Sequence, residues 1–307
     1  MCGFSIIVNK GENYNDHVIR NMTRSIIHRG PDNFGFINET IGDFDINLGH
    51  ARLSIIDLQE NSNQPFVSKC KKVLLVFNGE IYNFQEIKRE LKSLGIVFNT
   101  NSDTEVILES YLYWGEECLN RFNGMFSFAI LDKKREKLFV ARDRFGVKPL
   151  YYSQINQEEI VFSSEIKQFF FHPKVKKVIN SEAFYRFLFQ KSHKFSCESF
   201  FKNIFEVNQG ELITICLKRS SISLKKETWY RPELNQLDAN EPELEERFSE
   251  LFDNAVKLRL NADVPVGTGL SGGLDSSSIV CHIKDLIEQK KWNHPLKTFS
   301  SRFLNHA

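Results

Sequence analysis

The pattern of apolar and polar residues predicts strands and helices over the first two thirds of the chain. Alternation of apolar and polar residues predicts strands over residues 4–8, 126–132 and 136–142, the last two joined as a hairpin. Apolar positions around Arg52 predict a strand over residues 49–57, and an apolar run predicts another over residues 73–77. Apolar residues at helical spacing predict helices over residues 16–27 and 83–95 and a third that begins at Ser102. This order of elements favours two mixed sheets covered by helices over a regular βαβ repeat.

The pattern changes after residue 217, and a second domain is predicted beyond it. Residues 218–242 are rich in Lys, Ser, Glu, Asn and Pro, which is typical of an interdomain linker. A helix is predicted over residues 243–260, and the apolar residues of one face indicate packing against another element: Leu244, Phe248, Leu251, Phe252 and Ala255. A strand, a Gly-Ser loop and an amphipathic helix follow. The predicted domains are therefore residues 2–217 and 243–307.

Composition and charge narrow the choice of partners. With 307 residues and a net charge of +1, the chain has no basic excess that would attract nucleic acid or an anionic membrane surface. The six cysteines are scattered without metal-like spacing, so neither disulfides nor a metal site are expected. No signal peptide and no run of about 20 apolar residues is present, which predicts a cytoplasmic protein. Five of the 28 phenylalanines are interpreted as core residues on this pattern: Phe126, Phe128, Phe139, Phe184 and Phe187.

Cys2 is a candidate nucleophile because of its position. Removal of Met1 would leave Cys2 with both a thiol and a free α-amine. An α-amine has a pKa of about 7.7–8.0, so it can be neutral near physiological pH and accept the proton of an attacking thiol. A Cys can also occupy position 2 by chance, so this position alone does not establish catalysis.

Three further stretches allow both a structural and a functional interpretation. Asn78-Gly79 after a strand is typical of a hairpin turn, but an amide side chain and an unhindered backbone N–H are also the two donors of an oxyanion hole. Arg52 is either a solvated strand residue or a clamp for a carboxylate. Asp103, by local rules, is an acid favoured in the first turn of a helix.

The Gly-Ser loop at residues 271–278 is a candidate phosphate site. It joins a predicted strand to a predicted helix, so unpaired N–H groups and the positive end of the helix dipole would face an anion. The Lys of a Walker loop is missing, and a merely flexible turn is the alternative.

Five motifs occur in one order, at residues 2–3, 28–32, 52–57, 78–83 and 271–277. With these motifs the chain closely resembles the glutamine-hydrolysing asparagine synthetases. The resemblance implies an α+β N-terminal-nucleophile hydrolase fold, an αββα sandwich, followed by an α/β ATP-pyrophosphatase-type domain. Members of that family continue well beyond the ATP loop, so we expect the second domain to be incomplete here, in a fragment or a truncated product.

The resemblance also implies roles for individual residues. Cys2 would be the nucleophile, and Asn78 and Gly79 would stabilise the oxyanion. Glutamine would be bound by Arg52, Leu53, Ser54, Ile55, Ile56, Asn78, Gly79, Glu80 and Asp103. ATP, with Mg²⁺ in the complete synthetase, would be bound by Leu270, Ser271, Gly272, Gly273, Leu274, Asp275, Ser276, Ser277 and Ser301. The complete enzyme would use ATP, aspartate and glutamine to form asparagine, and a homodimer is compatible with the resemblance.

Several alternatives stay open or are disfavoured by particular residues. Amidotransferases that form phosphoribosylamine or glucosamine phosphate are disfavoured by the motif at 271–276, and β-lactam synthetases by Cys2. A related synthetase that amidates a sugar acid stays open, since the acceptor pocket would lie beyond Ala307. A non-catalytic relic also stays open, although it would be free to lose any of the site residues.

Overall fold

A computed structural model of the chain describes residues 1–11, 14, 16–190, 198–218, 220–234, 239–289 and 295–301. The predicted second domain therefore lies partly outside the described residues, at 290–294 and 302–307, as does Cys197. The chain divides into two units, Met1–Pro232 and Glu233–Ala307. Each unit is described by itself.

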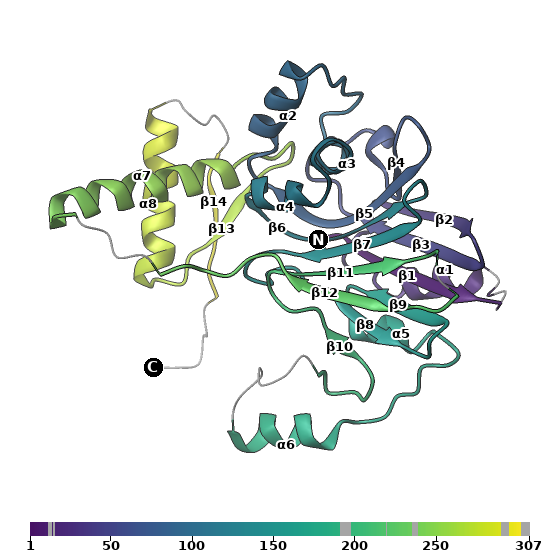
Figure 1. The fold of residues 1–307 in the computed structure, drawn as a ribbon. Helices are drawn as coiled ribbons and strands as arrows, with labels where there is room; N and C mark the ends of the chain where they lie inside the picture. The colour runs from purple at the N-terminus through teal and green to yellow at the C-terminus, as the bar shows by residue number, and fades with distance from the viewer. Residues whose placement is uncertain are drawn as a thin grey trace. The chain divides into compact units, whose positions relative to one another are not determined.

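Two six-stranded sheets form the centre of the first unit (Figure 1). The first sheet has the order β10 (Phe205–Glu206), β8 (Tyr151–Gln154), β9 (Glu159–Ser163), β1 (Gly3–Lys10), β3 (Phe44–Arg52) and β2 (Asn33–Ile41). The second has the order β12 (Leu224–Thr228), β11 (Glu211–Cys216), β7 (Lys137–Arg142), β6 (Gly124–Asp132), β5 (Val73–Ile81) and β4 (Phe66–Val67). All strand pairs described in these sheets are antiparallel, so the prediction of mixed sheets was wrong.

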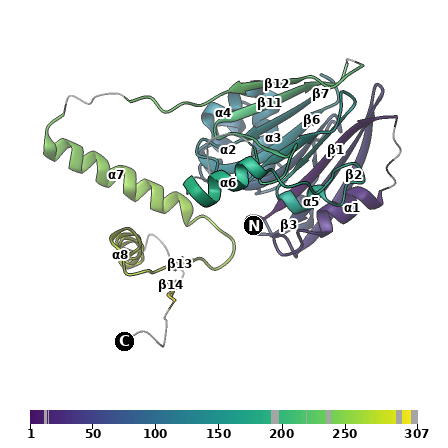
Figure 2. The ribbon, with the colours of Figure 1, turned by 90° about the horizontal axis from the view of Figure 1, so that it is seen from below.

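Helices cover the outer face of each sheet. The first sheet carries α1 (His17–Arg24) and α5 (Ile166–Phe169), and α6 (Ser181–Gln190) follows later in the chain. The second sheet carries α2 (Phe84–Ser93), α3 (Asp103–Trp114) and α4 (Cys118–Arg121), with the short 3₁₀ turns η1 (Glu60–Ser62) and η2 (Gly115–Glu117) in its connections. Figure 2 shows the stacked strands from a second direction. The order helix, sheet, sheet, helix is the predicted αββα sandwich, which is confirmed.

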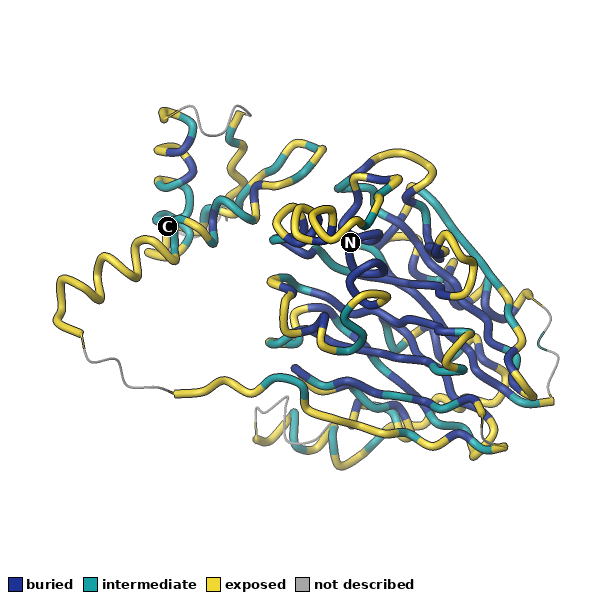
Figure 3. Tube along the Cα trace, turned by 45° about the horizontal axis from the view of Figure 1, so that its top comes forward, coloured by how far each residue is buried: buried dark blue, intermediate teal, exposed yellow. Residues whose placement is uncertain are grey.

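Three apolar clusters hold these layers together. The inner faces of the sheets meet in one cluster, which includes Phe4, Val76 and Phe162. Phe128 and its neighbours pack β5 and β6 against α3, while Met22 packs α1 against the other sheet. The buried residues accordingly concentrate in the strands of this unit (Figure 3). Phe126, Phe128 and Phe139 are buried as predicted, but Phe184 is 48% exposed on α6, so the core interpretation was wrong for it.

Two predicted boundaries differ from the structure. The strand expected over residues 49–57 ends at Arg52, because the following residues turn away and Asp57 adopts a φ of 53°. Part of the stretch assigned to a linker forms β12, which pairs with β11 along the edge of the second sheet. The polar composition of β12 suits an edge strand, whose side chains are largely exposed.

The second unit contains two helices and two parallel strands. Its elements are α7 (Glu241–Arg259), β13 (Gly267–Gly269), α8 (Leu274–Glu288) and β14 (Lys297–Phe299), with β13 and β14 paired in parallel. Val256 and Leu260 pack against Ile283 and Leu286 of α8. Phe248 of α7 is 69% exposed, and Leu244 and Leu251 are exposed too, so the predicted packing of that face was wrong for these residues.

Candidate active site

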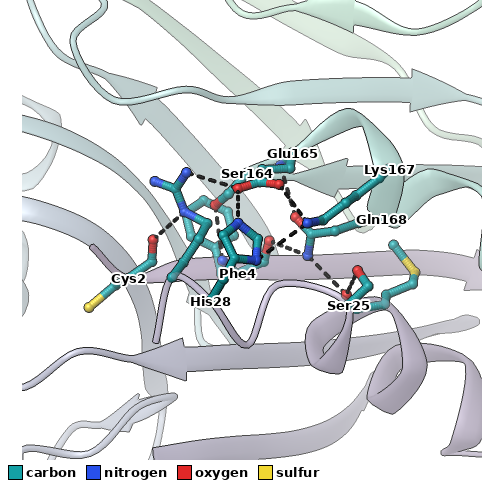
Figure 4. Close-up of polar contacts among 10 residues, drawn as sticks. Cys2, Phe4, Ser25, His28, Ser164, Glu165, Lys167 and Gln168 are labelled. Atoms are coloured by element: carbon teal, nitrogen blue, oxygen red, sulfur yellow. Dashed lines mark hydrogen bonds and ion pairs between the residues drawn. The ribbon is translucent and has the colours of Figure 1, made fainter. Parts of the chain in front are cut away.

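Cys2 lies immediately before β1 and is held on both sides. Its sulfur accepts a hydrogen bond from the N–H of Leu53 at 3.3 Å, and its thiol donates to the carbonyl of Leu53 at 3.5 Å. The Nε of Arg29 donates to the carbonyl of Cys2 at 2.8 Å, and Arg29 forms an ion pair with Glu165 at 3.0 Å. Figure 4 shows the sulfur pointing away from that charged group. The hydrogen bonds with Leu53 therefore hold the sulfur in position, on the side away from the ion pair of Arg29 and Glu165.

A cavity of about 230 Å³ adjoins Cys2 and collects most of the predicted site. Its lining includes these predicted residues: Cys2, Arg52, Leu53, Ile55, Ile56, Asn78, Gly79, Glu80 and Asp103. Ser54 is not among the lining residues, and its backbone N–H donates to Asp32 at 2.7 Å. The rest of the lining consists of residues that the sequence analysis did not name as site residues: Met1, Gln64, Phe77, Ser102, Thr104, Met125, Val147 and Lys148.

Asn78 and Gly79 lie within β5, not in a turn. They pair with Ser127 and Phe126 of β6, so the hairpin-turn interpretation was wrong. Asn78 is fully buried, and neither the nitrogen nor the oxygen of its side-chain amide has a hydrogen-bond partner among the described residues. Because a buried polar group without a partner is costly, this amide is well suited to receive a ligand.

The N–H of Gly79 lies on one edge of β5, and both Asn78 and Gly79 line the cavity. Successive N–H groups of a strand alternate between its two edges, so Phe77, Gly79 and Ile81 share one edge. On this edge the N–H of Phe77 donates to Gln64 at 2.7 Å and the N–H of Ile81 donates to Asp103 at 3.1 Å. A Cβ on Gly79 would lie 2.1 Å from the carbonyl oxygen of Met125, so only glycine fits. The two residues predicted to supply oxyanion donors therefore both line the cavity.

Arg52 is buried at the end of β3, which excludes the interpretation as a solvated residue. Its guanidinium donates to the carbonyl of Gln59 at 3.0 Å and to the side chain of Asn63 at 2.7 Å. It also donates to the carbonyls of Ile56 and Asp57. Arg52 thus organises the loop that carries Ile55 and Ile56 while it lines the cavity with a positive charge.

Two carboxylates face the same cavity. Asp103 is buried, and burial raises its pKa to about 7, with Glu80 adding to the effect. Burial also raises the pKa of Glu80, while nearby Lys148 opposes this shift. Asp103 begins α3 as predicted, but its carboxylate accepts the N–H of Ile81 in β5, a contact that no local rule foretells. The pair offers negative charge to a cationic group of a ligand.

Burial shifts the pKa of the Cys2 thiol and the pKa of the amino terminus in opposite directions. Burial raises the pKa of the Cys2 thiol, so the thiol keeps its proton until a base accepts it. Burial lowers the pKa of the chain's amino terminus, which stands on Met1 in this structure. This shift favours the neutral form of the amine, which is the form that can act as that base.

The Gly-Ser loop of the second unit connects β13 to α8. Gly272 has a φ of 84°, and the hydroxyls of Ser271 and Ser276 lie 3.0 Å apart. The residues from Ser271 to Asp275 are exposed, and the N-terminus of the 15-residue helix α8 begins directly after Gly273. The N–H of Leu270 donates to the carbonyl of Phe299 at 2.9 Å. The loop and Ser301, which follows β14, therefore lie at the carboxyl edge of the same parallel pair, where α/β sheets bind ligands.

No cluster of three His, Cys, Asp or Glu side chains suited to a metal ion occurs in the described part of the chain. Asp275 is the single carboxylate between Leu270 and Ser277. These residues alone do not form a Mg²⁺ site, so no step below depends on the ion.

Comparison with known families identifies the first unit. The family described as "Glutamine amidotransferase domain" matches residues 1–230. The chain belongs to the glutamine amidotransferase family. The family described as "Asparagine synthase" matches residues 247–307, which include the Gly-Ser loop. The resemblance inferred from the five motifs is confirmed by these two matches.

Relatives of this chain include longer proteins with related names. A putative glutamine-hydrolysing asparagine synthetase 2 of Methanocaldococcus jannaschii is 36% identical, over 99% of this chain and 60% of its own length. Asparagine synthetase 1 of Bacillus subtilis is also 36% identical, over 99% of this chain and 46% of its own length. Amidase chry2 of Gibberella zeae is 31% identical over 94% of this chain. The chain thus spans about half the length of these curated relatives.

A solved structure supports the fold assignment. Glutamine phosphoribosylpyrophosphate amidotransferase from B. subtilis aligns with a TM-score of 0.54 at 18% identity, covering 97% of this chain and 65% of that protein. At this identity the likeness concerns the fold alone. In addition, none of the helices within the described ranges is long and apolar enough to cross a membrane.

Proposed function

We propose that the first unit hydrolyses glutamine to glutamate and ammonia. The observation that carries this proposal is the cavity at Cys2, which is lined both by this residue and by Asn78, whose side-chain amide has no partner among the described residues. Positive charge from Arg52 and negative charge from Glu80 and Asp103 line the same cavity. Such a set of charges suits the α-carboxylate and α-ammonium of an amino acid whose reacting amide is neutral.

In the proposed reaction, Met1 is removed and the α-amine of Cys2 accepts the thiol proton as the sulfur attacks the amide carbon of glutamine. The resulting oxyanion accepts hydrogen bonds from the side chain of Asn78 and the N–H of Gly79. Collapse of this intermediate breaks the C–N bond, and the amine returns its proton to the departing ammonia. Water then hydrolyses the thioester, which releases glutamate and restores the thiol.

For a protein that carries this chain, we propose ATP-dependent formation of asparagine from aspartate, with glutamine as the amido donor. The names of the relatives and the match of residues 247–307 support this step. The loop from Leu270 to Ser277, together with Ser301, is the proposed ATP site. We expect the protein that carries this chain to be a cytoplasmic homodimer that binds neither nucleic acid nor membranes.

The test is glutamate release from glutamine, after mass spectrometry has confirmed removal of Met1. The Cys2→Ala variant serves as the control, and only the chain with Cys2 is expected to release glutamate. Retention of Met1, or no release by the folded protein, would overturn the proposed hydrolysis and favour a non-catalytic relic.

The synthetase step is tested with ¹⁵N-amide glutamine, aspartate and ATP. Labelled asparagine together with AMP would support the proposed acceptor. Labelled ammonia without asparagine would limit the activity to hydrolysis or to another acceptor, such as a sugar acid.

A further inference from the structure

His50 is a fully buried histidine that the proposed reaction does not use, and it is not among the residues that line the cavity. It lies in β3, two residues before Arg52 and therefore on the same face of the strand. Its Nε2 lies 2.9 Å from the carbonyl oxygen of Phe77 in β5. Because β3 and β5 belong to different sheets, this contact bridges the two sheets of the first unit.

The contact with Phe77 determines where the ring of His50 carries its proton. A carbonyl oxygen can only accept a hydrogen bond, so Nε2 must be the donor. Burial lowers the pKa of His50 to about 4, so the ring is neutral near physiological pH and has a single N–H. The other nitrogen, Nδ1, is buried and has no partner among the described residues. The hydrogen bond to Phe77 is therefore the contact that orients this ring.

The backbone of Phe77 lies on an edge of β5 that lacks a neighbouring strand at this point. The short strand β4 pairs with β5 only at Leu74 and Leu75. The N–H and C=O of one strand residue point to the same edge, so both groups of Phe77 need other partners. Gln64 accepts the N–H at 2.7 Å, and His50 donates to the carbonyl at 2.9 Å. These two side chains take the place of the missing strand.

The bond from His50 fixes the peptide group that leads into Asn78. The carbonyl of Phe77 belongs to that peptide, and because a peptide group is planar, fixing its oxygen also fixes the N and Cα of Asn78. The side-chain amide of Asn78 has no hydrogen-bond partner among the described residues. The position of this amide therefore depends on the backbone that His50 and Gln64 hold.

His50 also connects this backbone to the rest of the site. It pairs with Phe4 of β1, which lies two residues after Cys2, and it precedes Arg52 by two residues in β3. The strands that carry the thiol, the guanidinium and the Asn78 amide are thus linked through one side chain.

We propose that His50 is a positioning residue of the glutaminase site, whose hydrogen bond to the carbonyl of Phe77 holds the amide of Asn78 where the oxyanion forms. This inference rests on the proposed function, because it assigns Asn78 the role of oxyanion donor. His50 itself touches neither the substrate nor the thiol in this assignment and acts through the backbone of β5.

The first measurement uses the parent protein and does not need activity. Nitrogen NMR reports which ring nitrogen of His50 carries the proton, and a proton on Nε2 is expected. A neutral ring protonated on Nδ1 would overturn the proposal, because Nε2 could not then donate to Phe77.

The second measurement compares the hydrogen exchange of the Phe77 amide in folded variants. His50→Met removes the donor, and loss of one hydrogen bond should speed this exchange about tenfold. His50→Gln keeps an N–H donor and should stay close to the parent. His172→Met is the matched control, because His172 is equally buried but lies outside the cavity lining, with Nε2 3.1 Å from Glu159. If His50→Met does not fold, His50→Asn replaces it, since its shorter amide does not reach the carbonyl.

The third measurement is steady-state glutamate release. An oxyanion donor acts in the transition state, so His50→Met should lower kcat about 10- to 100-fold and change KM much less. His50→Gln should restore most of kcat, and His172→Met should keep the parent value. In an Asn78→Ala background the loss caused by His50→Met should be smaller, because the amide that His50 positions is gone.

The outcomes separate the two proposals. Unchanged exchange of the Phe77 amide in folded His50→Met overturns the role of His50, whatever the activity. A kcat of His50→Met at the parent level, or equal fold losses with and without Asn78, also overturns it. No glutamate release by the parent protein overturns the proposed hydrolysis, and the exchange experiment then still decides whether His50 holds the strand at Asn78.

Discussion

Replacement of Asn78 by Ala separates a catalytic from a structural role of this buried amide. If the side chain is an oxyanion donor, its removal should lower turnover roughly 10²- to 10³-fold, or about 2.7–4 kcal/mol of transition-state stabilisation. The same change breaks no hydrogen bond of the folded protein among the described residues. An unpartnered buried polar group costs about 1–3 kcal/mol, so its loss offsets the lost packing. We therefore expect the free energy of unfolding to change by less than about 1 kcal/mol.

Gln168→Ala is the matched control, because Gln168 is an equally buried amide that is fully bonded. Its Oε1 accepts the N–H of Glu165 at 2.9 Å, and its Nε2 donates to the hydroxyl of Ser5 at 2.6 Å and to the carbonyl of Phe4 at 3.3 Å. Its truncation leaves buried groups without partners and should cost roughly 1–3 kcal/mol of stability.

The assay combines glutamate release at saturating glutamine with urea denaturation of each variant. The expected result is that Asn78→Ala loses turnover and keeps its stability, whereas Gln168→Ala loses stability. Turnover of Asn78→Ala close to the parent value, or a stability loss as large as that of Gln168→Ala, would refute the reasoning.

Three further predictions follow from burial. The pKa of Asp103 is raised to about 7 mainly by burial, so the folded protein binds this proton more tightly than the unfolded chain. The free energy of unfolding should then fall as pH rises from about 4 to about 7, and Asp103→Asn should remove this part of the slope in urea titrations. Gly79→Ala places a Cβ 2.1 Å from the carbonyl oxygen of Met125, so we expect a stability loss of about 1–3 kcal/mol, seen as a lower melting temperature. Phe128→Ala should cost about 3–5 kcal/mol because Phe128 is fully buried, whereas Phe184→Ala should change stability by less than about 0.5 kcal/mol.

Each of these predictions has an outcome that contradicts it. An unchanged slope in Asp103→Asn would mean that this carboxyl is not the group that titrates. A Gly79→Ala variant as stable as the parent would show that β5 and β6 separate easily. Equal losses for Phe128→Ala and Phe184→Ala would contradict the burial that distinguishes these two residues.

Much of the site could be predicted from the sequence because its chemistry is carried by short motifs. Cys2, Asn78 and Gly79 are residue types that suit nucleophilic attack and oxyanion binding, and all three line the cavity. The αββα class followed from the family resemblance that these motifs carry, whereas periodicity predicted only the strands and helices themselves. Periods of two and of 3.6 residues are local properties, and they distinguish strands from helices without knowledge of the fold.

Local rules failed where distant segments compete with them. Asn78-Gly79 has the sequence of a turn, but pairing with β6 extends β5 through Ile81 and keeps both residues in the strand. Asn83 illustrates the same point at the start of α2. Asn is a favoured residue at this helix position, but its side chain bonds to the backbone of Arg121 and Asn123 and makes no capping hydrogen bond to α2.

From the sequence by itself, the period of the apolar residues determined where strands and helices form, because periodicity needs only neighbouring residues. The motifs determined the kinds of reactive groups, and the family resemblance that they carry implied the αββα class. The tertiary structure alone decided which groups share a cavity. Cys2, Glu80, Asp103 and Lys148 come from four separate segments, and their distances depend on the register of the sheets and the packing of α3. It also decided which charges are buried, and burial shifts the pKa of both the thiol and the amine. The sequence analysis did not single out Lys148 for this reason, since no local pattern marks a lysine as buried.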